Sequence, residues 1–420
     1  MNILVIGSGG REHAIVWKLS KSKHKVNLWC APGNGGISQL ATCVDIKPME
    51  FDKIVSFSKE QKMDLVVVAP DDPLASGLVD ILEANDIPAF GPSKSAARLE
   101  GSKAFSKDFM KKHHIPTADY QVFDDATEAL KYIEKSSFPI VVKADGLALG
   151  KGVIIAQDKK TAVDAVHNMM EEKKFGDAGN KIVIEEFLTG PEVSVLTFSD
   201  GKTLLPMVSS QDHKRAFDHD KGLNTGGMGA FAPSKIYSPE IEKLCQETIF
   251  KPTLEGLRKE GIQFKGVLYF GLILTPKGPY VLEYNARFGD PETQVVLPLM
   301  KNDLLDVFMA VIEEQLEDVV LEWEDKECVC VVLASGGYPV SYKKGYEIKG
   351  LERYEASQEI FVFHAGTQKA DEKYITAGGR VLGVTAKGEN MEVTRQKAYE
   401  AVKNISFTDM HYRTDIGVKK

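Results

Sequence analysis

Short apolar runs alternate with amphipathic stretches over roughly the first 95 residues, which is the βαβ pattern of a parallel sheet. The runs predict strands at Asn2–Ile6, Lys25–Trp29, Asp64–Ala69 and Pro88–Phe90. Helices are predicted at Arg11–Ser22, directly after a glycine loop, and at Pro73–Asn85. Ser93 suits the N-cap of a short helix, and another helix is predicted from about Lys103 to His113.

A second alternating unit follows and contains the densest glycine loop of the chain. Its strands are predicted at Ile140–Lys143, Val153–Ala156 and Lys181–Phe187. Three further strands and a long helix are predicted at Val193–Phe198, Val267–Leu274, Tyr280–Tyr284 and Asp303–Glu317. The tail from about Trp323 predicts strands with glycine turns and one closing helix, at Val329–Ala334, Glu359–His364, Val381–Thr385 and Val393–Val402.

Composition and charge narrow the class of protein. With 420 residues, 43% hydrophobic and 27% charged, the chain is long enough for about three globular domains. The net charge of −8 argues against a general role on nucleic acid or a membrane surface, so the expected partners are small molecules. No signal sequence and no apolar run near the ~20 residues of a membrane span is present, which predicts a cytoplasmic protein.

The five cysteines favour packing over chemistry. Their number is odd, and the sequence contains no C-x-x-C pair. Cys328 and Cys330 stand two residues apart in an apolar run, so they share one face of a predicted buried strand. Because free cysteine is usually a buried residue, packing is favoured over metal binding or redox chemistry.

The first glycine loop, Gly7–Gly10, follows a strand and opens a helix. Backbone N–H groups at such a helix start form an anion site. Dinucleotide binding is disfavoured, because G-x-G-x-x-G needs glycine where Glu12 stands and the next strand ends in Trp29 and Cys30 rather than an acid. A plain structural turn and a sugar-phosphate site, helped by Arg11, both remain open.

The second loop, Gly146–Gly152, resembles a phosphate-binding loop but is not one of the Walker type. Only three residues separate Gly146 from Gly150, and Gly152 stands where a Ser or Thr would bind magnesium. Lys143 before the loop and Lys151 within it nevertheless suit a triphosphate. A flexible hairpin without a ligand is the alternative.

Polar residues near the ends of two predicted strands could bind a metal ion or a nucleotide. Glu283 and Asn285 project to the same face of a predicted strand, where two oxygen ligands suit magnesium, although a solvated sheet face is the simpler reading. The apolar run Ile182–Leu188 ends with two carboxylates, and its exposed backbone could bind a purine edge while Glu192 binds ribose hydroxyls. Surface acids are the alternative there.

Taken together these segments resemble the ATP-grasp ligases, and among them most closely the phosphoribosylamine–glycine ligases. The resemblance covers the whole chain. It is carried by Gly7–His13, Ala31–Asn34, Lys143–Leu147, Gln211–Arg215, Asn224–Ala230 and Asn285–Gln294. The last two segments are the most specific, and the first alone would be weak.

The resemblance implies an α/β ATP-grasp fold with an N-terminal Rossmann-like domain and a C-terminal β-rich domain. The implied boundaries are residues 1–100 for the Rossmann-like substrate domain, 101–115 for a connecting helix, 116–190 for the lid subdomain, 191–322 for the central domain and 323–420 for the C-terminal domain. A monomer is expected. A glycine-rich lid, Gly146–Gly152 with Gly226 and Gly227, is expected to close over the site and exclude water.

The implied activity is ATP-dependent ligation of glycine to 5-phosphoribosylamine in purine biosynthesis, through a glycyl-phosphate intermediate. The implied nucleotide contacts are Lys103, Lys143, Gly146, Gly150, Lys151, Gly152, Glu185, Glu186, Phe187, Leu188 and Glu192. The implied substrate contacts are Gly9, Gly10, Arg11, Glu12, Asn34, Asp212, His213, Lys214, Arg215, Thr225, Gly226, Gly227, Arg287 and Asp290. The implied catalytic groups are Lys143, Asp212, Lys214 and Arg287, and Glu283 with Asn285 would hold magnesium or manganese. Another ATP-grasp carboxylate–amine ligase and a nucleotide-binding protein without turnover are the rival interpretations.

Overall fold

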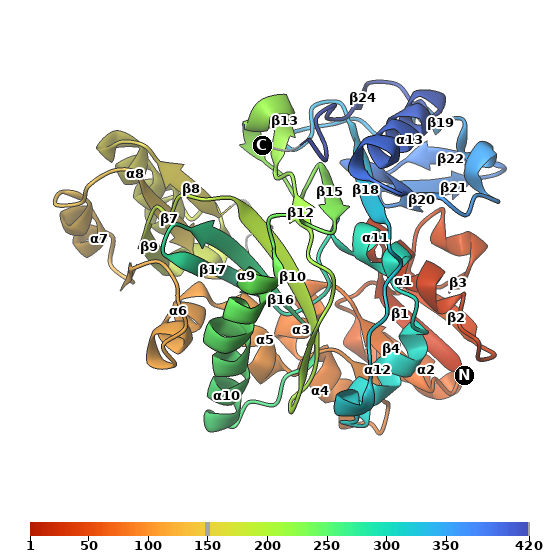
Figure 1. Ribbon diagram of the computed structural model, residues 1–420, viewed down its shortest axis with the longest axis horizontal. Helices are drawn as coiled ribbons and strands as arrows, with labels where there is room; N and C mark the ends of the chain where they lie inside the picture. The colour runs from red at the N-terminus through yellow and green to blue at the C-terminus, as the bar shows by residue number, and fades with distance from the viewer. Residues whose placement is uncertain (148–151, 419–420) are drawn as a thin grey trace.

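The computed structural model describes residues 1–147 and 152–418 (Figure 1). Its N-terminal part is a five-stranded parallel sheet in the order β3-β2-β1-β4-β5. The strands are β1 Asn2–Gly7, β2 Asn27–Pro32, β3 Thr42–Cys43, β4 Leu65–Val68 and β5 Ala89–Phe90. The helices of this part are α1 Gly10–Leu19, α2 Phe51–Glu60, α3 Asp71–Ser76, α4 Leu78–Glu83, α5 Lys94–Gly101 and α6 Lys103–Lys112.

The next part is a small antiparallel sheet in the order β6-β9-β7-β8. Its strands are β6 Tyr120–Phe123, β7 Ile140–Ala144, β8 Val153–Ala156 and β9 Ile182–Glu186. Two helices, α7 Ala126–Ile133 and α8 Lys159–Val166, pack on it through a separate apolar cluster that includes Ile133, Val142 and Ala162. This sheet therefore has its own core, and it stands apart from the main body in Figure 1.

The central sheet is antiparallel, in the order β11-β10-β16-β17. Its strands are β10 Glu192–Asp200, β11 Leu204–Pro206, β16 Lys265–Thr275 and β17 Gly278–Asn285. The helices associated with it are α9 Pro239–Cys245, α10 Lys251–Lys259 and α12 Leu304–Ile312. Nearly continuous apolar sequence makes β16 a buried strand that joins the two large hydrophobic clusters of the molecule.

The C-terminal sheet has six strands, in the order β12-β15-β18-β23-β20, with β24 paired to β18. They are β12 Gln211–Asp212, β15 Gly229–Ala232, β18 Glu327–Ser335, β20 Ile360–His364, β23 Arg380–Gly388 and β24 Met410–His411. A short hairpin, β13 Arg215–Phe217 with β14 Lys221–Asn224, projects between β12 and β15, and α13 Met391–Asn404 packs on β18 and β23. A three-stranded sheet, β19 Glu347–Ile348, β22 Lys373–Thr376 and β21 Thr367–Ala370, completes this part.

Two predicted helices differ from those in the structure. The segment Pro73–Asn85 holds two helices rather than one, because Gly77 has a φ of 92° and breaks the helical path between α3 and α4. The helix predicted at Asp303–Glu317 ends at Ile312, and Glu314 then adopts a φ of 58°. There the Glu314 carboxylate binds the ammonium groups of Lys202 and Lys265, which an unbroken helix would not allow.

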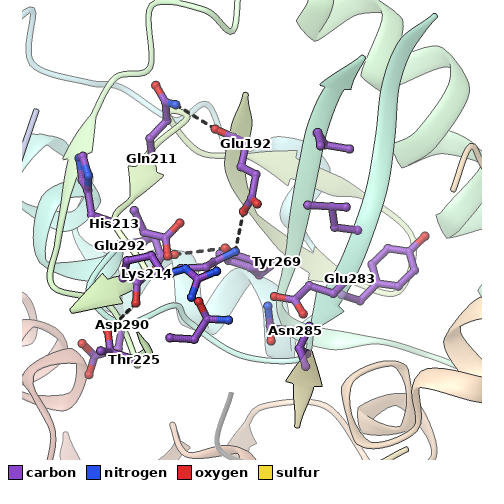
Figure 2. Close-up of a pocket in the computed structure, with 18 of the residues that line it drawn as sticks. Glu192, Gln211, His213, Lys214, Thr225, Tyr269, Glu283, Asn285, Asp290 and Glu292 are labelled. Carbon is purple, nitrogen blue, oxygen red and sulfur yellow. Dashed lines mark hydrogen bonds and ion pairs between the residues drawn. The ribbon is translucent and has the colours of Figure 1, made fainter. Parts of the chain in front are cut away.

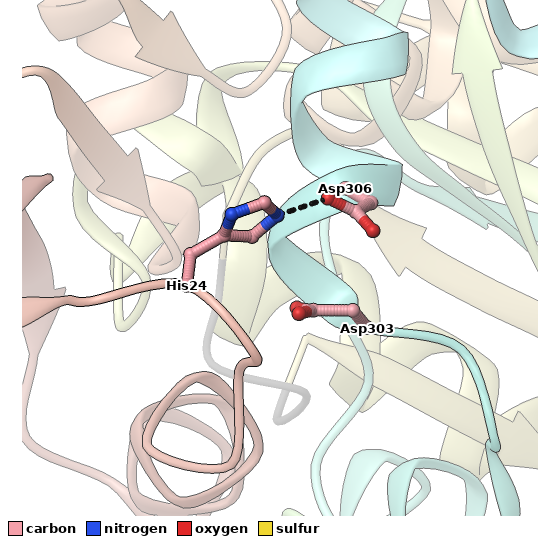
Figure 3. A group of neighbouring side chains, drawn as sticks. All are labelled: His24, Asp303 and Asp306. Carbon is pink, nitrogen blue, oxygen red and sulfur yellow. Dashed lines mark hydrogen bonds and ion pairs between the residues drawn. The ribbon is translucent and has the colours of Figure 1, made fainter.

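A polar contact links the N-terminal part to α12 (Figure 3). His24 Nε2 lies 2.7 Å from Asp306 Oδ1, and Asp303 Oδ2 accepts a hydrogen bond from the Lys23 backbone N–H at 2.9 Å. These three acidic and histidine side chains have atoms close enough to bind a metal. Lys23 Nζ, however, already lies 2.6 Å from Asp306 Oδ2 and supplies the positive charge, so the cluster serves as a structural link.

No helix within residues 1–147 or 152–418 has the combination of length and apolar character that crossing a membrane requires.

Candidate active site

A cavity of about 1140 Å³ is lined by the small sheet, the central sheet, the C-terminal part and helices of the N-terminal part, and Figure 2 shows residues that line it. The predicted site residues that line it are Arg11, Lys103, Lys143, Gly146, Gly152, Glu185, Glu186, Phe187, Leu188, Glu192, Asp212, His213, Lys214, Arg215, Thr225, Gly226, Glu283, Asn285, Arg287 and Asp290. The predicted residues Gly9, Gly10, Glu12, Asn34 and Gly227, all of which the structure describes, are not part of the lining. Gly150 and Lys151 lie outside the described residues.

Glu185 near the end of β9 binds two lysines. Its Oε2 lies 3.0 Å from Lys107 Nζ and 2.9 Å from Lys143 Nζ, and all three side chains are buried. Burial lowers the pKa of Lys107 to about 8, while the Glu185 carboxylate acts against that fall. Glu185 Oε1 has no hydrogen-bond partner among the described residues. Glu185 therefore orients both lysines and keeps one acceptor atom free.

The apolar end of the cavity fits a flat base. Val141 and Ile155 line it from the small sheet and Ile273 from the central sheet. Within the described part of the chain, the backbone groups of Phe187 and Leu188 take part in no hydrogen bond, so they are available to a base edge. The placing of a purine beside this strand end stays a prediction.

Lys103 occupies the first turn of α6, beside the second glycine loop. Its Nζ donates a hydrogen bond to the carbonyl oxygen of Gly146 at 2.8 Å. Asp145 Oδ1 accepts hydrogen bonds from the Ser102 hydroxyl and the Ala104 N–H, both at 3.0 Å, which ties the loop to the helix start. Burial lowers the pKa of Lys103, and Glu283 acts in the opposite direction.

Glu283 and Asn285 lie on one face of β17 near its end, as Figure 2 shows. The pairing of β17 with β16 is irregular at Leu282, whose carbonyl oxygen accepts a hydrogen bond from Lys143 Nζ at 3.4 Å. In the described chain, the Glu283 carboxylate forms no salt bridge or hydrogen bond. Burial raises the pKa of Glu283, but nearby cations, Lys214 first among them, hold it below its usual value. Asn285 Oδ1 accepts a long hydrogen bond from Arg287 Nη2 at 3.5 Å. An ionised carboxylate that is unpaired among the described residues, beside this amide oxygen, suits magnesium.

Lys214 lies in the short segment between β12 and β13, and its Nζ is 2.7 Å from Glu192 Oε2. Burial lowers the pKa of Lys214, but Glu192 and Asp212 raise it well above its usual value. Burial raises the pKa of the neighbouring Asp212 to about 7. Glu292 adds to that rise, and Lys214 opposes it. The pair thus combines a fixed cation with a carboxyl group that titrates near neutral pH.

Tyr269 and Glu292 complete this side of the cavity. The Tyr269 hydroxyl lies 3.1 Å from Glu292 Oε1, to which it donates, and 2.7 Å from the Ser194 hydroxyl. Burial raises the pKa of Glu292 above its usual value. Both residues line the cavity and were missing from the prediction.

Arg287 follows β17 and is fixed by an acid from α5. Arg287 Nη2 lies 2.8 Å from Glu100 Oε1, and Glu100 Oε2 accepts the Ala286 N–H at 2.7 Å. Burial lowers the pKa of Arg287, but Glu100 outweighs it and raises the pKa above its usual value. Arg287 Nε is buried and has no hydrogen-bond partner among the described residues. The guanidinium is therefore held in place with a donor to spare.

Asp290 is bound by an arginine of the C-terminal sheet. Arg380 Nη1 lies 3.2 Å from Asp290 Oδ1 and donates to the carbonyl oxygen of Gly226 at 2.6 Å. Burial raises the pKa of Asp290, but Arg380 and Arg11 hold it below its usual value. The Gly226 N–H donates to the Tyr338 hydroxyl at 3.1 Å. Two C-terminal side chains thus fix the glycine loop at the cavity.

Side chains from several parts of the chain occupy the space around the N-terminal glycine loop. Glu12 Oε2 accepts the Gly9 N–H at 2.6 Å, and Glu12 Oε1 lies 2.7 Å from Arg11 Nε. Asn34 Nδ2 donates to the carbonyl oxygens of Ser8 and His364, both at 2.8 Å, and its Oδ1 accepts two backbone N–H groups. A Cβ at Gly10 would lie 2.6 Å from Gln294 Nε2. These groups shape the loop behind Arg11, which alone of them reaches the cavity.

Sequence profiles of three phosphoribosylglycinamide synthetase domains match consecutive parts of the chain. The N domain matches residues 1–100, the ATP-grasp (A) domain residues 101–293 and the C domain residues 328–419. The chain belongs to the phosphoribosylglycinamide synthetase family. The family and the ATP-grasp fold predicted from the sequence are thereby confirmed.

Proteins of known identity match this chain over nearly its whole length. The phosphoribosylamine–glycine ligase of Caldanaerobacter subterraneus subsp. tengcongensis is 48% identical over 416 residues, which are 99% of this chain and 99% of that protein. The crystal structure of phosphoribosylamine–glycine ligase from Thermotoga maritima superposes with a TM-score of 0.86 at 35% identity, covering 99% of this chain and 100% of that one. The biotin carboxylase domain of Hydrogenobacter thermophilus 2-oxoglutarate carboxylase, in complex with MgADP, ADP and bicarbonate, shares the fold at 16% identity and a TM-score of 0.75, with 98% and 91% coverage.

Proposed function

We propose that this synthetase-family chain joins glycine to 5-phosphoribosylamine with ATP, giving glycinamide ribonucleotide, ADP and phosphate. The observation that carries the proposal is one cavity in which the Glu283 carboxylate, unpaired among the described residues, lies near lysine and arginine side chains. Glycine's carboxylate is a poor acyl donor, so it needs activation. We infer that it first attacks the γ-phosphate to give glycyl phosphate, and that the phosphoribosylamine nitrogen then displaces phosphate.

Glu283 and Asn285 are the residues that would hold magnesium. The fit rests on the donor set, since a carboxylate held ionised by neighbouring cations and an amide oxygen share one strand face. When bound, the ion would neutralise charge on the phosphate oxygens during transfer. Manganese favours similar oxygen ligands and is proposed as a substitute.

The remaining groups bind and orient the reactants. Lys103 and Lys143 line the cavity and would bind the phosphate chain of ATP. Lys214 and Arg287, which pair with Glu192 and Glu100, would bind the glycine carboxylate and its acyl phosphate. Holding reactants in line can supply about 7–11 kcal/mol, and a preorganised charged donor about 3–4 kcal/mol. No covalent bond to the enzyme is required.

Asp212 suits the removal of the amine proton. A general base works best when its pKa lies near the working pH, and burial brings the pKa of Asp212 to about 7. Its place beside Lys214 puts this carboxyl group in the proposed glycine region of the cavity.

A specific assay tests the proposal. The purified protein is incubated with ATP and magnesium, and ADP release is measured with glycine, with phosphoribosylamine, and with both. We expect rapid release only with both substrates, loss of release with a chelator, and recovery with magnesium or manganese. Release that needs a different acid or a different amine would favour another ATP-grasp carboxylate–amine ligase. ATP binding without any turnover would favour a nucleotide-binding protein.

A further inference from the structure

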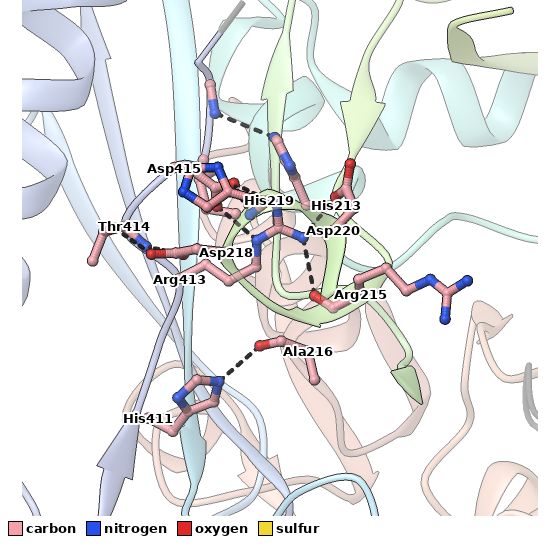
Figure 4. Close-up of polar contacts among 12 residues, drawn as sticks. His213, Arg215, Ala216, Asp218, His219, Asp220, His411, Arg413, Thr414 and Asp415 are labelled. Carbon is pink, nitrogen blue, oxygen red and sulfur yellow. Dashed lines mark hydrogen bonds and ion pairs between the residues drawn. The ribbon is translucent and has the colours of Figure 1, made fainter. Parts of the chain in front are cut away.

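The end of the described chain wraps around the β13–β14 hairpin, far from it in sequence (Figure 4). Arg413 is the centre of this contact and has no exposed surface. Its Nε and Nη2 donate to Asp415 Oδ1 and Oδ2 at 2.7 and 2.8 Å, in a two-point pairing. Its Nη1 donates at 3.0 Å both to Asp220 Oδ1 and to the carbonyl oxygen of Arg215.

Further contacts join residues 411–417, called the tail from here on, to the hairpin. Asp218 Oδ1 accepts the Thr414 N–H at 2.8 Å, and Asp218 Oδ2 accepts the Thr414 hydroxyl at 2.5 Å. His411 Nε2 lies 2.7 Å from the carbonyl oxygen of Ala216. The Phe217 ring packs edge-on against the His411 ring, with centroids 5.2 Å apart. The tail thus contacts both the backbone and the side chains of the hairpin.

Two residues of the hairpin turn adopt a left-handed backbone conformation. His219 and Asp220 have φ values of 60° and 53°, a left-handed region that is unfavourable for residues with a side chain. Asp415 Oδ2 accepts the His219 N–H at 2.9 Å. Burial raises the pKa of Asp415, but Arg413 and the His219 N–H hold it well below its usual range, so it stays ionised. The tail therefore supplies the groups that stabilise this turn.

The other end of the hairpin reaches the cavity. The Gly417 N–H donates to His213 Nε2 at 3.3 Å, so the tail contacts the residues on both sides of Lys214. The carbonyl oxygen of Lys214 accepts both the N–H and the hydroxyl of Thr225 at 2.8 Å. The Thr225 hydroxyl in turn accepts the Gly227 N–H at 3.0 Å. A displacement of the hairpin would thus move Lys214 and the Thr225–Gly227 loop together.

We propose that Arg413 is a positioning residue for the ligation: it fixes the hairpin so that Lys214 and the Thr225–Gly227 loop stand where the acyl group reacts. The proposal rests on the proposed function. Arg413 itself does not touch the reactants. Of the nucleotide residues, Lys103, Lys143 and Glu185 lie on other elements. Glu192 is joined to Lys214 only by a solvent-exposed ion pair, and such pairs contribute little energy, so the effect falls mainly on the acyl-transfer side.

Arg413→Lys is the principal test. Lysine keeps the charge but loses the planar two-point pairing, and a misplacement of about 1 Å can cost on the order of 100-fold in rate. We expect kcat per folded molecule to fall at least about tenfold, with more ADP released per product formed. The KM for ATP should stay within about twofold. Arg353→Lys, in an exposed bond to Asn404 of the same domain, is the matched control and should equal the unchanged protein.

Asp218→Asn is a second variant, because it weakens the two Thr414 contacts and alters the group beside Asp415 without changing Arg413 itself. A smaller fall in kcat, about threefold, with the same split between kcat and the KM for ATP, supports the proposal. The proposal is overturned if either variant matches the unchanged protein in kcat per folded molecule, so that any loss of turnover equals the loss of folded fraction seen by thermal unfolding. Absence of glycine-dependent ADP release in the unchanged protein would instead overturn the proposed function.

Discussion

Replacing Glu283 with glutamine tests the metal pair most directly. The change keeps the size of the side chain and one oxygen, and removes only the negative charge that the surrounding cations hold ionised. A charged group preorganised in a water-poor site contributes about 3–4 kcal/mol to lowering the barrier, so turnover with magnesium should fall about 100- to 1000-fold. The free energy of unfolding should change far less, because in the described chain the Glu283 carboxylate forms no salt bridge or hydrogen bond.

The assay measures ADP release and product against magnesium concentration, together with thermal unfolding of each variant. Glu260→Gln is the control, since Glu260 lies outside the cavity lining and bonds to His113 Nε2 and Lys112 Nζ, both at 2.9 Å. It should lose some stability but keep its turnover. Equal activity per folded molecule for Glu283→Gln, with an unchanged magnesium dependence, would refute the assignment of this carboxylate to the metal.

Two further predictions concern the contact between His13 and His364 and the backbone at Gly227. Buried His13 accepts the His364 N–H, and burial lowers the pKa of His13 well below its usual value and that of His364 to about 4. Between pH 6.5 and 4 the unfolded chain binds protons on these two histidines and the folded chain does not. The free energy of unfolding should therefore decrease as the pH is lowered, by up to about 1.4 kcal/mol per pH unit for each histidine. His13→Asn keeps an acceptor and should halve that slope in unfolding experiments, and an unchanged slope would contradict this. Gly227→Ala should remove product formation but not ATP binding, because φ is +112° and the new Cβ would lie 2.5 Å from Pro291 Cδ; normal coupling of ADP to product would disprove it.

The elements with a strong periodic signal were predictable from the sequence. The strand predicted at Val153–Ala156 has those bounds, and the one predicted at Val267–Leu274 lies within β16. The helix ends were less accessible. A single left-handed residue, Gly77 or Glu314, divides or ends a helix whose apolar spacing continues past it.

The cavity was predictable where one segment carries several polar groups, as around Glu283 and Asp290. It was not predictable where a partner comes from another part of the chain. Lys107 follows a helical pattern that gives no sign of its bond to Glu185, and Arg380 stands some 90 residues after Asp290 in the sequence. Such pairs depend on the fold, so the sequence alone offers no signal for them. The domain boundaries, the monomeric state and the cytoplasmic location stay predictions.

The shared C-terminal sheet has a consequence for how this protein can be divided. β15 comes from the middle of the chain, yet it lies between β12 and the long strand β18, across the boundary predicted at residue 322. A fragment ending there would leave β15 with one bare edge, open to pairing with other chains. The last hundred residues are therefore not an exchangeable module, and attempts to swap them between relatives should carry β12 to β15 along.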